Sequence, residues 1–323
     1  MQFLRALLCL SLFAGAAFAQ NNPVLVVLNK NDSNLAILDP ATMKVLEKVP
    51  VGDSPHEVII SATGKTAYVS NYGAQKPGNS LSIIDLATRK ETKRVDLGGF
   101  YRPHELAEID GKVYFTSETS RTVARYDPAT DKIDWVMGTG QSATHMLVVS
   151  NDKKRMYTAN IASDSVTAIN LGLPPSPANI TQIAVGKQPE AIHVSPDGAE
   201  VWVGLNAENA IDVIDTATNK FKQKINLGER PYRVKFTPDG KRVFATIPNT
   251  KEIVVFDAAN KQEIKRMKLD SAPMGIAFSK DGRLVFVTAG QTDCVLKIDT
   301  EKYEITGKTE TGTVPDGVAY FGS

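Results

Sequence analysis

A short apolar strand that ends in Asp or Asn and runs into a turn recurs seven times along the chain. Its last residues are Asp39, Asp85, Asp127, Asn170, Asp215, Asp257 and Asp299, at spacings of 46, 42, 43, 45, 42 and 42 residues. Two insertions, at residues 75–78 and around residues 174–177, account for the two longest spacings. A period of about 40–45 residues built from strands is typical of the blades of a β-propeller.

Each repeat holds four strand-length apolar runs separated by turn residues. In one repeat the predicted strands are residues 191–195, 200–205, 209–215 and 222–227. A glycine at the first turn supplies the positive φ that a tight hairpin needs. The repeat around residue 150 has Asn151-Asp152 there instead, and these residues also tolerate that conformation. The Asp that ends each third strand predicts an Asx turn into the fourth.

The two ends of the chain complete the ring. Residues 24–28 are predicted to be the second strand of a blade, and residues 317–321 form a lone first strand. Pairing one C-terminal strand with three N-terminal strands gives a seventh blade and hides the sheet edges. The sequence therefore predicts an all-β, seven-bladed propeller with four antiparallel strands per blade, in a single domain of residues 20–323.

The first 19 residues read as a secretory signal peptide rather than as part of this domain. Arg5 precedes a short apolar run, and Ala17-Phe18-Ala19 is a small-residue cleavage pattern. No later stretch is long and apolar enough to span a bilayer. We therefore expect export, to the periplasm or the cell exterior, without a membrane anchor.

The charge of the chain is balanced. It has 323 residues, with 37 Lys and Arg against 36 Asp and Glu, and loss of Arg5 with the signal peptide leaves 36 of each. A net charge of zero argues against nucleic acid as a partner, because that affinity is mostly electrostatic. Cys294 would be the only cysteine left, which excludes a disulfide framework within the chain.

The repeats resemble those of YVTN-family β-propellers, of the YncE-like or lactonase-like kind. The resemblance rests on three segments, AYVSNYG with NSLSIIDLAT, MYTANIASDSVTAIN and VWVGLNAENAIDVIDTAT, and extends over residues 23–323. It implies the propeller fold. It does not fix a function, because such propellers serve as lactonases, as quinone- or haem-linked proteins and as binding modules.

One repeat position gathers polar residues. It lies just before each predicted innermost strand, and around the ring it holds His56, His104, His145, Glu190, Tyr232, Met274 and Asp316. Three of the four histidines of the chain thus share one position in three consecutive blades. Because innermost strands converge on the propeller axis, we expect these residues to be neighbours at one mouth of the central channel.

Such a ring could bind a ligand or a metal ion. Three imidazoles beside a carboxylate suit Zn²⁺ or a similar divalent ion with an open position. Strict alternation along the strand would instead turn the ring residues toward the blade interfaces and aim Glu57, Glu105 and Arg233 into the channel. The candidate metal ligands are His56, His104 and His145, if they face the axis, and Glu57, Glu105 and Glu190 are the candidate bases.

Three further residues are candidates for ligand contact. Asn71 and Asn160 end second strands on the side of the ring that carries the histidines, although Asn at a strand end is more often part of a turn. Arg102 lies in a loop beside the predicted mouth and could clamp an anion. His193 lies inside a strand and is expected to pack in the core or line the channel.

The sequence contains no complete catalytic motif, so it leaves open whether the protein is an enzyme. The leading hypothesis is an exported binding protein that holds a small ligand, a divalent metal ion or a loop of a protein partner at the channel mouth. The first alternative is a metal-assisted hydrolase of the lactonase type. The second is a protein–protein scaffold that does not use the channel.

Overall fold

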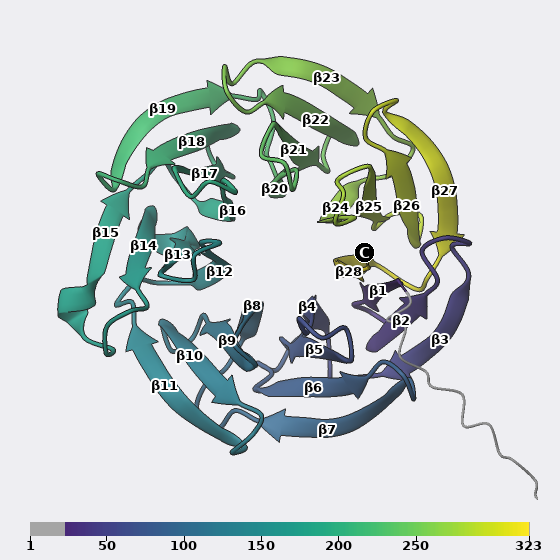
Figure 1. Ribbon diagram of the computed structural model, residues 1–323, viewed down its shortest axis with the longest axis horizontal. Helices are drawn as coiled ribbons and strands as arrows, with labels where there is room; N and C mark the ends of the chain where they lie inside the picture. Colours follow the sequence, from purple (N-terminus) through teal and green to yellow (C-terminus); the bar gives the residue numbers. More distant parts are fainter. Residues whose placement is uncertain (1–22, 323) are drawn as a thin grey trace, which may run out of the picture.

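Seven antiparallel sheets of four strands each are arranged radially around a central axis (Figure 1). The structure is a computed structural model and describes residues 23–322, so the predicted signal peptide at residues 1–19 lies outside the described residues. The prediction of an all-β, seven-bladed propeller is confirmed.

The strands follow each other from the axis outward within each blade. Blade one consists of β28 (Pro315–Phe321), β1 (Val24–Asn29), β2 (Asn34–Leu38) and β3 (Val45–Pro50). Blade two consists of β4 (Pro55–Ile60), β5 (Thr66–Asn71), β6 (Ser80–Asp85) and β7 (Lys90–Asp96). Blade three consists of β8 (Pro103–Ile109), β9 (Lys112–Ser117), β10 (Thr122–Asp127) and β11 (Lys132–Gly138). Blade four consists of β12 (Thr144–Val149), β13 (Arg155–Asn160), β14 (Ser165–Asn170) and β15 (Ile180–Ala184).

The remaining blades repeat the plan. Blade five consists of β16 (Pro189–Val194), β17 (Glu200–Leu205), β18 (Ala210–Asp215) and β19 (Lys220–Asn226). Blade six consists of β20 (Arg233–Phe236), β21 (Arg242–Ile247), β22 (Glu252–Asp257) and β23 (Glu263–Lys268). Blade seven consists of β24 (Pro273–Phe278), β25 (Leu284–Ala289), β26 (Cys294–Asp299) and β27 (Glu304–Glu310). Two short 3-10 helices, η1 (Ile161–Ser163) and η2 (Pro177–Asn179), belong to the loops of blade four.

The ring closes as predicted, by the pairing of one C-terminal strand with the N-terminal strands. β28 pairs with β1 in antiparallel register, with Val318 opposite Val27 and Tyr320 opposite Leu25. Every blade thus has four strands, and β1 is not left as the edge of its sheet.

The hydrophobic core lies between neighbouring blades rather than on the axis. Tyr157 and Val166 of blade four, for example, pack with Ile192 and Val203 of blade five. The outermost strands are mostly exposed and carry many charged residues, which discourages pairing with other chains.

The turns follow the sequence pattern in all blades, with one difference in detail. The carboxylate or amide oxygen at the end of each third strand accepts a backbone N–H two or three residues later, which confirms the Asx turns. Gly64 takes the positive φ expected at the first turn. In blade four, however, Lys153 rather than Asn151 or Asp152 adopts positive φ, at 59°.

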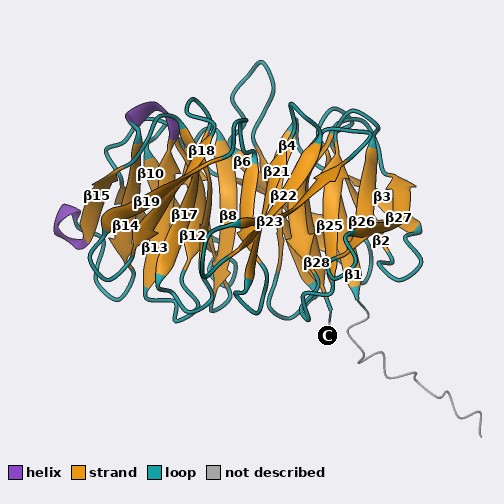
Figure 2. Ribbon diagram, turned by 90° about the horizontal axis from the view of Figure 1, so that it is seen from above, coloured by secondary structure: helices purple, strands orange, loops and turns teal. Residues whose placement is uncertain are grey.

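One face of the disc carries the beginnings of the innermost strands, and the other face carries their ends. The innermost strands all begin at one face and end at the other, and the C-terminus marks the face where they end (Figure 2). We call these the entry face and the exit face of the channel. In residues 23–322, no helix has the length and apolar character of a membrane span.

Candidate functional site

A β-bulge lies near the beginning of the innermost strand in six of the seven blades. In blade two, Pro55 pairs with Asn71 and Val58 pairs with Val69, so His56 and Glu57 together face a single residue, Ser70. A bulge of this kind disrupts the ladder and redirects side chains. The strict alternation considered from the sequence therefore fails at this point, because both bulge residues can turn toward the axis.

Hydroxyl groups on the second strands hold the bulges in place. Thr116 accepts a hydrogen bond from the Glu105 N–H at 3.0 Å and donates one to the carbonyl of His145 at 2.6 Å. In blade six, which has no bulge, Thr246 makes the equivalent hydrogen bonds with the Arg233 N–H and the carbonyl of Met274. Each of these hydroxyls thus holds the start of the innermost strand of its own blade and joins that blade to the next.

The structure brings His56, His104 and His145 together at the entry face, and we call these three residues the histidine cluster. The ring centroids of His56 and His104 are 4.1 Å apart, and those of His104 and His145 are 3.6 Å apart. His104 lies between the other two and has no exposed surface, whereas 8% of His56 and of His145 is exposed. Burial, together with the neighbouring His145 and His56, lowers the pKa of His104 well below its usual value. The central imidazole is therefore neutral and has one nitrogen lone pair available.

A carboxylate orients one outer ring of the cluster. Glu118 contacts Nδ1 of His145 with one oxygen and accepts a hydrogen bond from the Tyr72 hydroxyl with the other, at 2.7 Å. Burial opposes ionisation of Glu118, but the hydrogen bonds from His145 and Tyr72 outweigh it and lower its pKa. Because an ionised carboxylate only accepts, Nδ1 of His145 is the donor and its Nε2 is left free toward the cluster.

Asp316 lies beside the other outer ring. Its Oδ2 is 3.5 Å from Nδ1 of His56 and 3.7 Å from Nζ of Lys30. The Tyr232 hydroxyl donates to the same carboxylate at 2.9 Å. Burial and the adjacent Asp316 raise the pKa of Tyr232 well above its usual value, so its hydroxyl stays protonated.

Several imidazole nitrogens of the cluster have no hydrogen-bond partner. Both nitrogens of His104, Nδ1 of His56 and Nε2 of His145 are buried without one. Two overlapping groups, His56–Glu57–His104 and His104–Glu118–His145, each place three potential ligand atoms within 4.8 Å of one another. Ligand atoms on a tetrahedral Zn²⁺ are roughly 3.3 Å apart, so either group would need only a small contraction to hold the ion.

A layer of charged residues lies directly below the cluster. Arg233 forms a buried ion pair with Glu57, and its guanidinium stacks 4.2 Å from the ring centre of Tyr232. Its Nη1 is also 3.8 Å from Glu190, whose other oxygen accepts from Asn206. Burial alone would raise the pKa of Glu57, but Arg233 and His56 lower it to about 2. Glu57 is therefore a carboxylate at neutral pH, firmly bound to Arg233.

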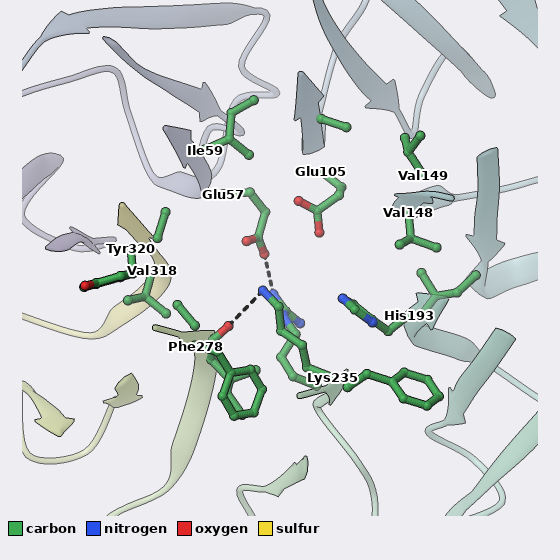
Figure 3. Close-up of a pocket in the computed structure, with 18 of the residues that line it drawn as sticks. Glu57, Ile59, Glu105, Val148, Val149, His193, Lys235, Phe278, Val318 and Tyr320 are labelled. Carbon is green, nitrogen blue, oxygen red and sulfur yellow. Dashed lines mark hydrogen bonds and ion pairs between the residues drawn. The ribbon is translucent and has the colours of Figure 1, made fainter. Parts of the chain in front are cut away.

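Beyond this layer, a cavity of about 680 Å³ extends along the channel to the exit face (Figure 3). Glu57, Glu105 and Arg233 line its inner end, and Lys235 and His193 lie further along. Its walls include Ile59, Val148, Phe278, Val318 and Tyr320. The channel thus contains two distinct environments, separated by the Glu57–Arg233 pair.

Comparison with known proteins agrees with this architecture. Residues 169–322 match the model of a family described as YNCE-like beta-propellers. The chain is a seven-bladed β-propeller, and residues 169–322 are similar to YNCE-like beta-propellers. No curated protein matches its sequence.

Solved structures share the fold of this propeller at low sequence identity. Kuenenia stuttgartiensis hydrazine synthase is 19% identical with a TM-score of 0.72, and the match covers 82% of this chain and 89% of that one. A putative 6-phosphogluconolactonase from Bacteroides fragilis is 13% identical with a TM-score of 0.75, covering 93% and 98%. The dihydro-heme d1 dehydrogenase NirN is 14% identical with a TM-score of 0.66, covering 93% and 75%. These similarities show the fold alone.

Three other residues predicted to contact a ligand make contacts within the fold instead. Asn71 donates to the hydroxyls of Ser80 and Ser82 and accepts from the Gly52 N–H. Asn160 likewise binds hydroxyl groups of the neighbouring third strand. Arg102 stacks 4.5 Å from the ring centre of Tyr72 and binds the carbonyls of the inserted loop. These three side chains shape the loops around the cluster and do not point into it.

Sequence reasoning missed the residues that come directly after the second strands. Four of them contact ring residues: Lys30, Tyr72, Glu118 and Asn206. The sequence does mark this position, because it comes directly after the residue that ends each second strand: Asn29, Asn71, Ser117 and Leu205. It is polar in blades one, two, three and five, on the same side of the ring as the histidines.

Proposed function

We propose that this propeller is a binding protein whose histidine cluster holds a divalent metal ion, with Zn²⁺ as the best match. The observation that carries the proposal is the fully buried His104, both of whose ring nitrogens lack a partner while it is stacked between two further imidazoles. Leaving a buried donor or acceptor unsatisfied costs about 1–3 kcal/mol. A bound cation would accept the lone pair of one His104 nitrogen and so remove part of this cost.

The types of ligand support a borderline metal rather than calcium or magnesium. Neutral imidazole suits Zn²⁺, Cu²⁺ and Ni²⁺, whereas Ca²⁺ and Mg²⁺ prefer sites made of oxygens. The contact between Glu118 and His145 has the form of the carboxylate–histidine pair that commonly orients metal ligands. Each group supplies three protein ligands, which would leave an open position on the metal for a small molecule or a partner's side chain.

Zinc titration of metal-free protein tests the proposal. We expect Zn²⁺ at 100 times its Kd to raise the free energy of unfolding by about 2.7 kcal/mol. His104→Ala should weaken binding by about 100-fold or more, beyond the roughly 10- to 100-fold expected for the orienting carboxylate in Glu118→Gln. Calorimetric titration measures both.

His193→Ala is the matched control, because His193 is the only other histidine and lies outside the cluster. Its zinc affinity should equal that of the unaltered protein. If zinc neither binds nor stabilises the protein, or if His104→Ala binds it equally well, the proposed metal site is wrong.

A metal-assisted hydrolase is a second candidate function. It is favoured by the open position of the proposed metal site beside the carboxylates of Glu190 and Asp316, and by the structural similarity to a protein named as a putative 6-phosphogluconolactonase. A metal would polarise a lactone carbonyl and activate water. Hydrolysis of a lactone by the zinc-loaded protein would favour the hydrolase if a chelator abolishes the activity. Zinc binding without hydrolysis would support the binding function only.

Export to the periplasm or the cell exterior is part of the proposal. It rests on the apolar run and the Ala17-Phe18-Ala19 pattern near the start of the chain. Expression of the full chain followed by N-terminal sequencing tests it, with Gln20 expected as the first residue. Recovery of unprocessed protein from the cytoplasm would contradict it.

A further inference from the structure

The channel cavity on the exit side contains a cation without a partner. Lys235 projects into the channel from β20, and its Nζ is 3.3 Å from the carbonyl of Ile276 (Figure 3). Among the described residues, no carboxylate oxygen lies within 4.0 Å of that Nζ. Of the other cations that line the cavity, Arg233 is already paired with Glu57, and Lys280 is exposed to solvent. Burial lowers the pKa of Lys235, and the more distant Glu105 and Glu57 only partly offset this shift. The cavity therefore contains an amino group that no carboxylate contacts.

Glu105 lines the same part of the cavity as Lys235 (Figure 3). Its Oε1 accepts a hydrogen bond from the Leu106 N–H at 3.0 Å. Burial and the adjacent Glu57 carboxylate raise its pKa.

His193 contributes a further polar group, a neutral imidazole, to this part of the channel. Burial and the nearby Lys235 lower its pKa to about 3, so the imidazole is neutral. Its buried Nδ1 has no hydrogen-bond partner. Lys235, Glu105 and His193 therefore lie along one part of the channel, and the Glu57 carboxylate of the same cavity is paired with Arg233 (Figure 3).

Apolar side chains form the rest of the wall. Ile59, Val148, Val149, Phe278 and Val318 come from four different blades and line the channel toward the exit face. Pockets of about 300–1,000 Å³ with apolar walls and few polar groups are typical small-molecule sites. A volume of about 680 Å³ is thus sufficient for a ligand with a sizeable apolar part.

We propose that this cavity binds a small carboxylic acid with an apolar body. The carboxylate would pair with Lys235, while the apolar part lies along Ile59, Val148 and Phe278. An anion compensates the ammonium group, and a cation or a neutral ligand does not. The site is separate from the histidine cluster, because the Glu57–Arg233 pair lies between them.

Binding of octanoate, measured by calorimetry, tests the inference on the unaltered protein. Octanol has the same apolar chain without the charge, and octylamine reverses the charge. We expect octanoate to bind at least about tenfold more tightly than octanol, the usual worth of a charge-assisted hydrogen bond, and octylamine not to bind. Equal affinity for octanoate and octanol, or absence of octanoate binding at millimolar concentration, would overturn the proposal.

Lys235→Met removes the ammonium group and keeps the length of the side chain. It should weaken octanoate binding by at least about tenfold and leave octanol binding unchanged. Lys132→Met is the matched control, because Lys132 is exposed on an outermost strand. Retained octanoate affinity in Lys235→Met would contradict the assignment. Zinc titration of the same variants tests the metal site separately, so that a loss of octanoate binding is not mistaken for a loss of zinc binding.

Discussion

Deleting residues 314–323 is expected to abolish the cooperative folding of the ring. The deletion removes β28, which pairs with β1 and packs against β4 and β24. It also removes the carbonyl of Asp316, which accepts the Thr288 hydroxyl at 2.8 Å. The exposed edge of β1 would present the apolar run of Val24–Asn29 to solvent. We expect a loss of more than about 5 kcal/mol, the lower end of the total stability of a domain.

Deletion of residues 322–323 alone is the control, because it leaves every pair between β28 and β1 intact. Thermal unfolding followed by circular dichroism distinguishes the two truncations. The shorter deletion should melt like the intact chain, whereas the longer one should show a broad transition or aggregate. An unchanged cooperative melt after the longer deletion would mean that closure by β28 does not stabilise the ring.

The fold could be predicted from the sequence because the information is local and repeated. A strand pattern, an Asx turn and a hairpin turn recur in every blade, so an ambiguity in one repeat is resolved by the others. The departure at Lys153 shows the limit of this reasoning. The turn needs one residue with positive φ, but the residue that takes it depends on where the strands around the turn stop pairing.

The candidate site was only partly predictable. The repeat alignment placed His56, His104 and His145 at one position, and the structure brings them together. Sequence reasoning did not identify Glu118 or Tyr72, because their contacts cross from one blade to the next. Such contacts depend on how loops from different blades meet, and strand periodicity carries no information about that.

The bulges explain why the orientation of the ring residues could not be read from alternation. A regular strand would send one of two consecutive residues to the blade interface. Opposite Ser70, both His56 and Glu57 occupy the space of one residue, and both reach the channel. The bulge depends on the hydroxyl of the facing strand and on the next blade, so it is a property of the assembled ring.

Arg233→Met is expected to cause the largest loss of stability among single substitutions in the channel. Arg233 and Glu57 are both buried, and the guanidinium also donates to the carbonyl of Tyr232. Removing one partner of a buried ion pair typically costs about 3–5 kcal/mol, because the other charge is left uncompensated. Urea unfolding at pH 8, where Glu57 is ionised, should show a loss of this size.

The pH dependence of that loss identifies its cause. In the unaltered protein the pKa of Glu57 is lowered to about 2, so its contribution is complete above the usual glutamate pKa and disappears as the pH falls toward 2. Without Arg233, burial raises the pKa of Glu57, and protonation relieves the buried charge. The difference between Arg233→Met and the unaltered protein should therefore shrink on acidification from pH 8 to pH 4.

The double variant Glu57→Gln with Arg233→Met separates charge from packing. A neutral amide beside Met leaves no buried ion, so the double variant should recover most of the stability that Arg233→Met loses at pH 8, and its stability should depend less on pH. If it remains as unstable as Arg233→Met, the lost stacking of Arg233 on Tyr232 is responsible rather than the charge of Glu57. The layer between the histidine cluster and the cavity would then be held together by packing and not by its ion pair.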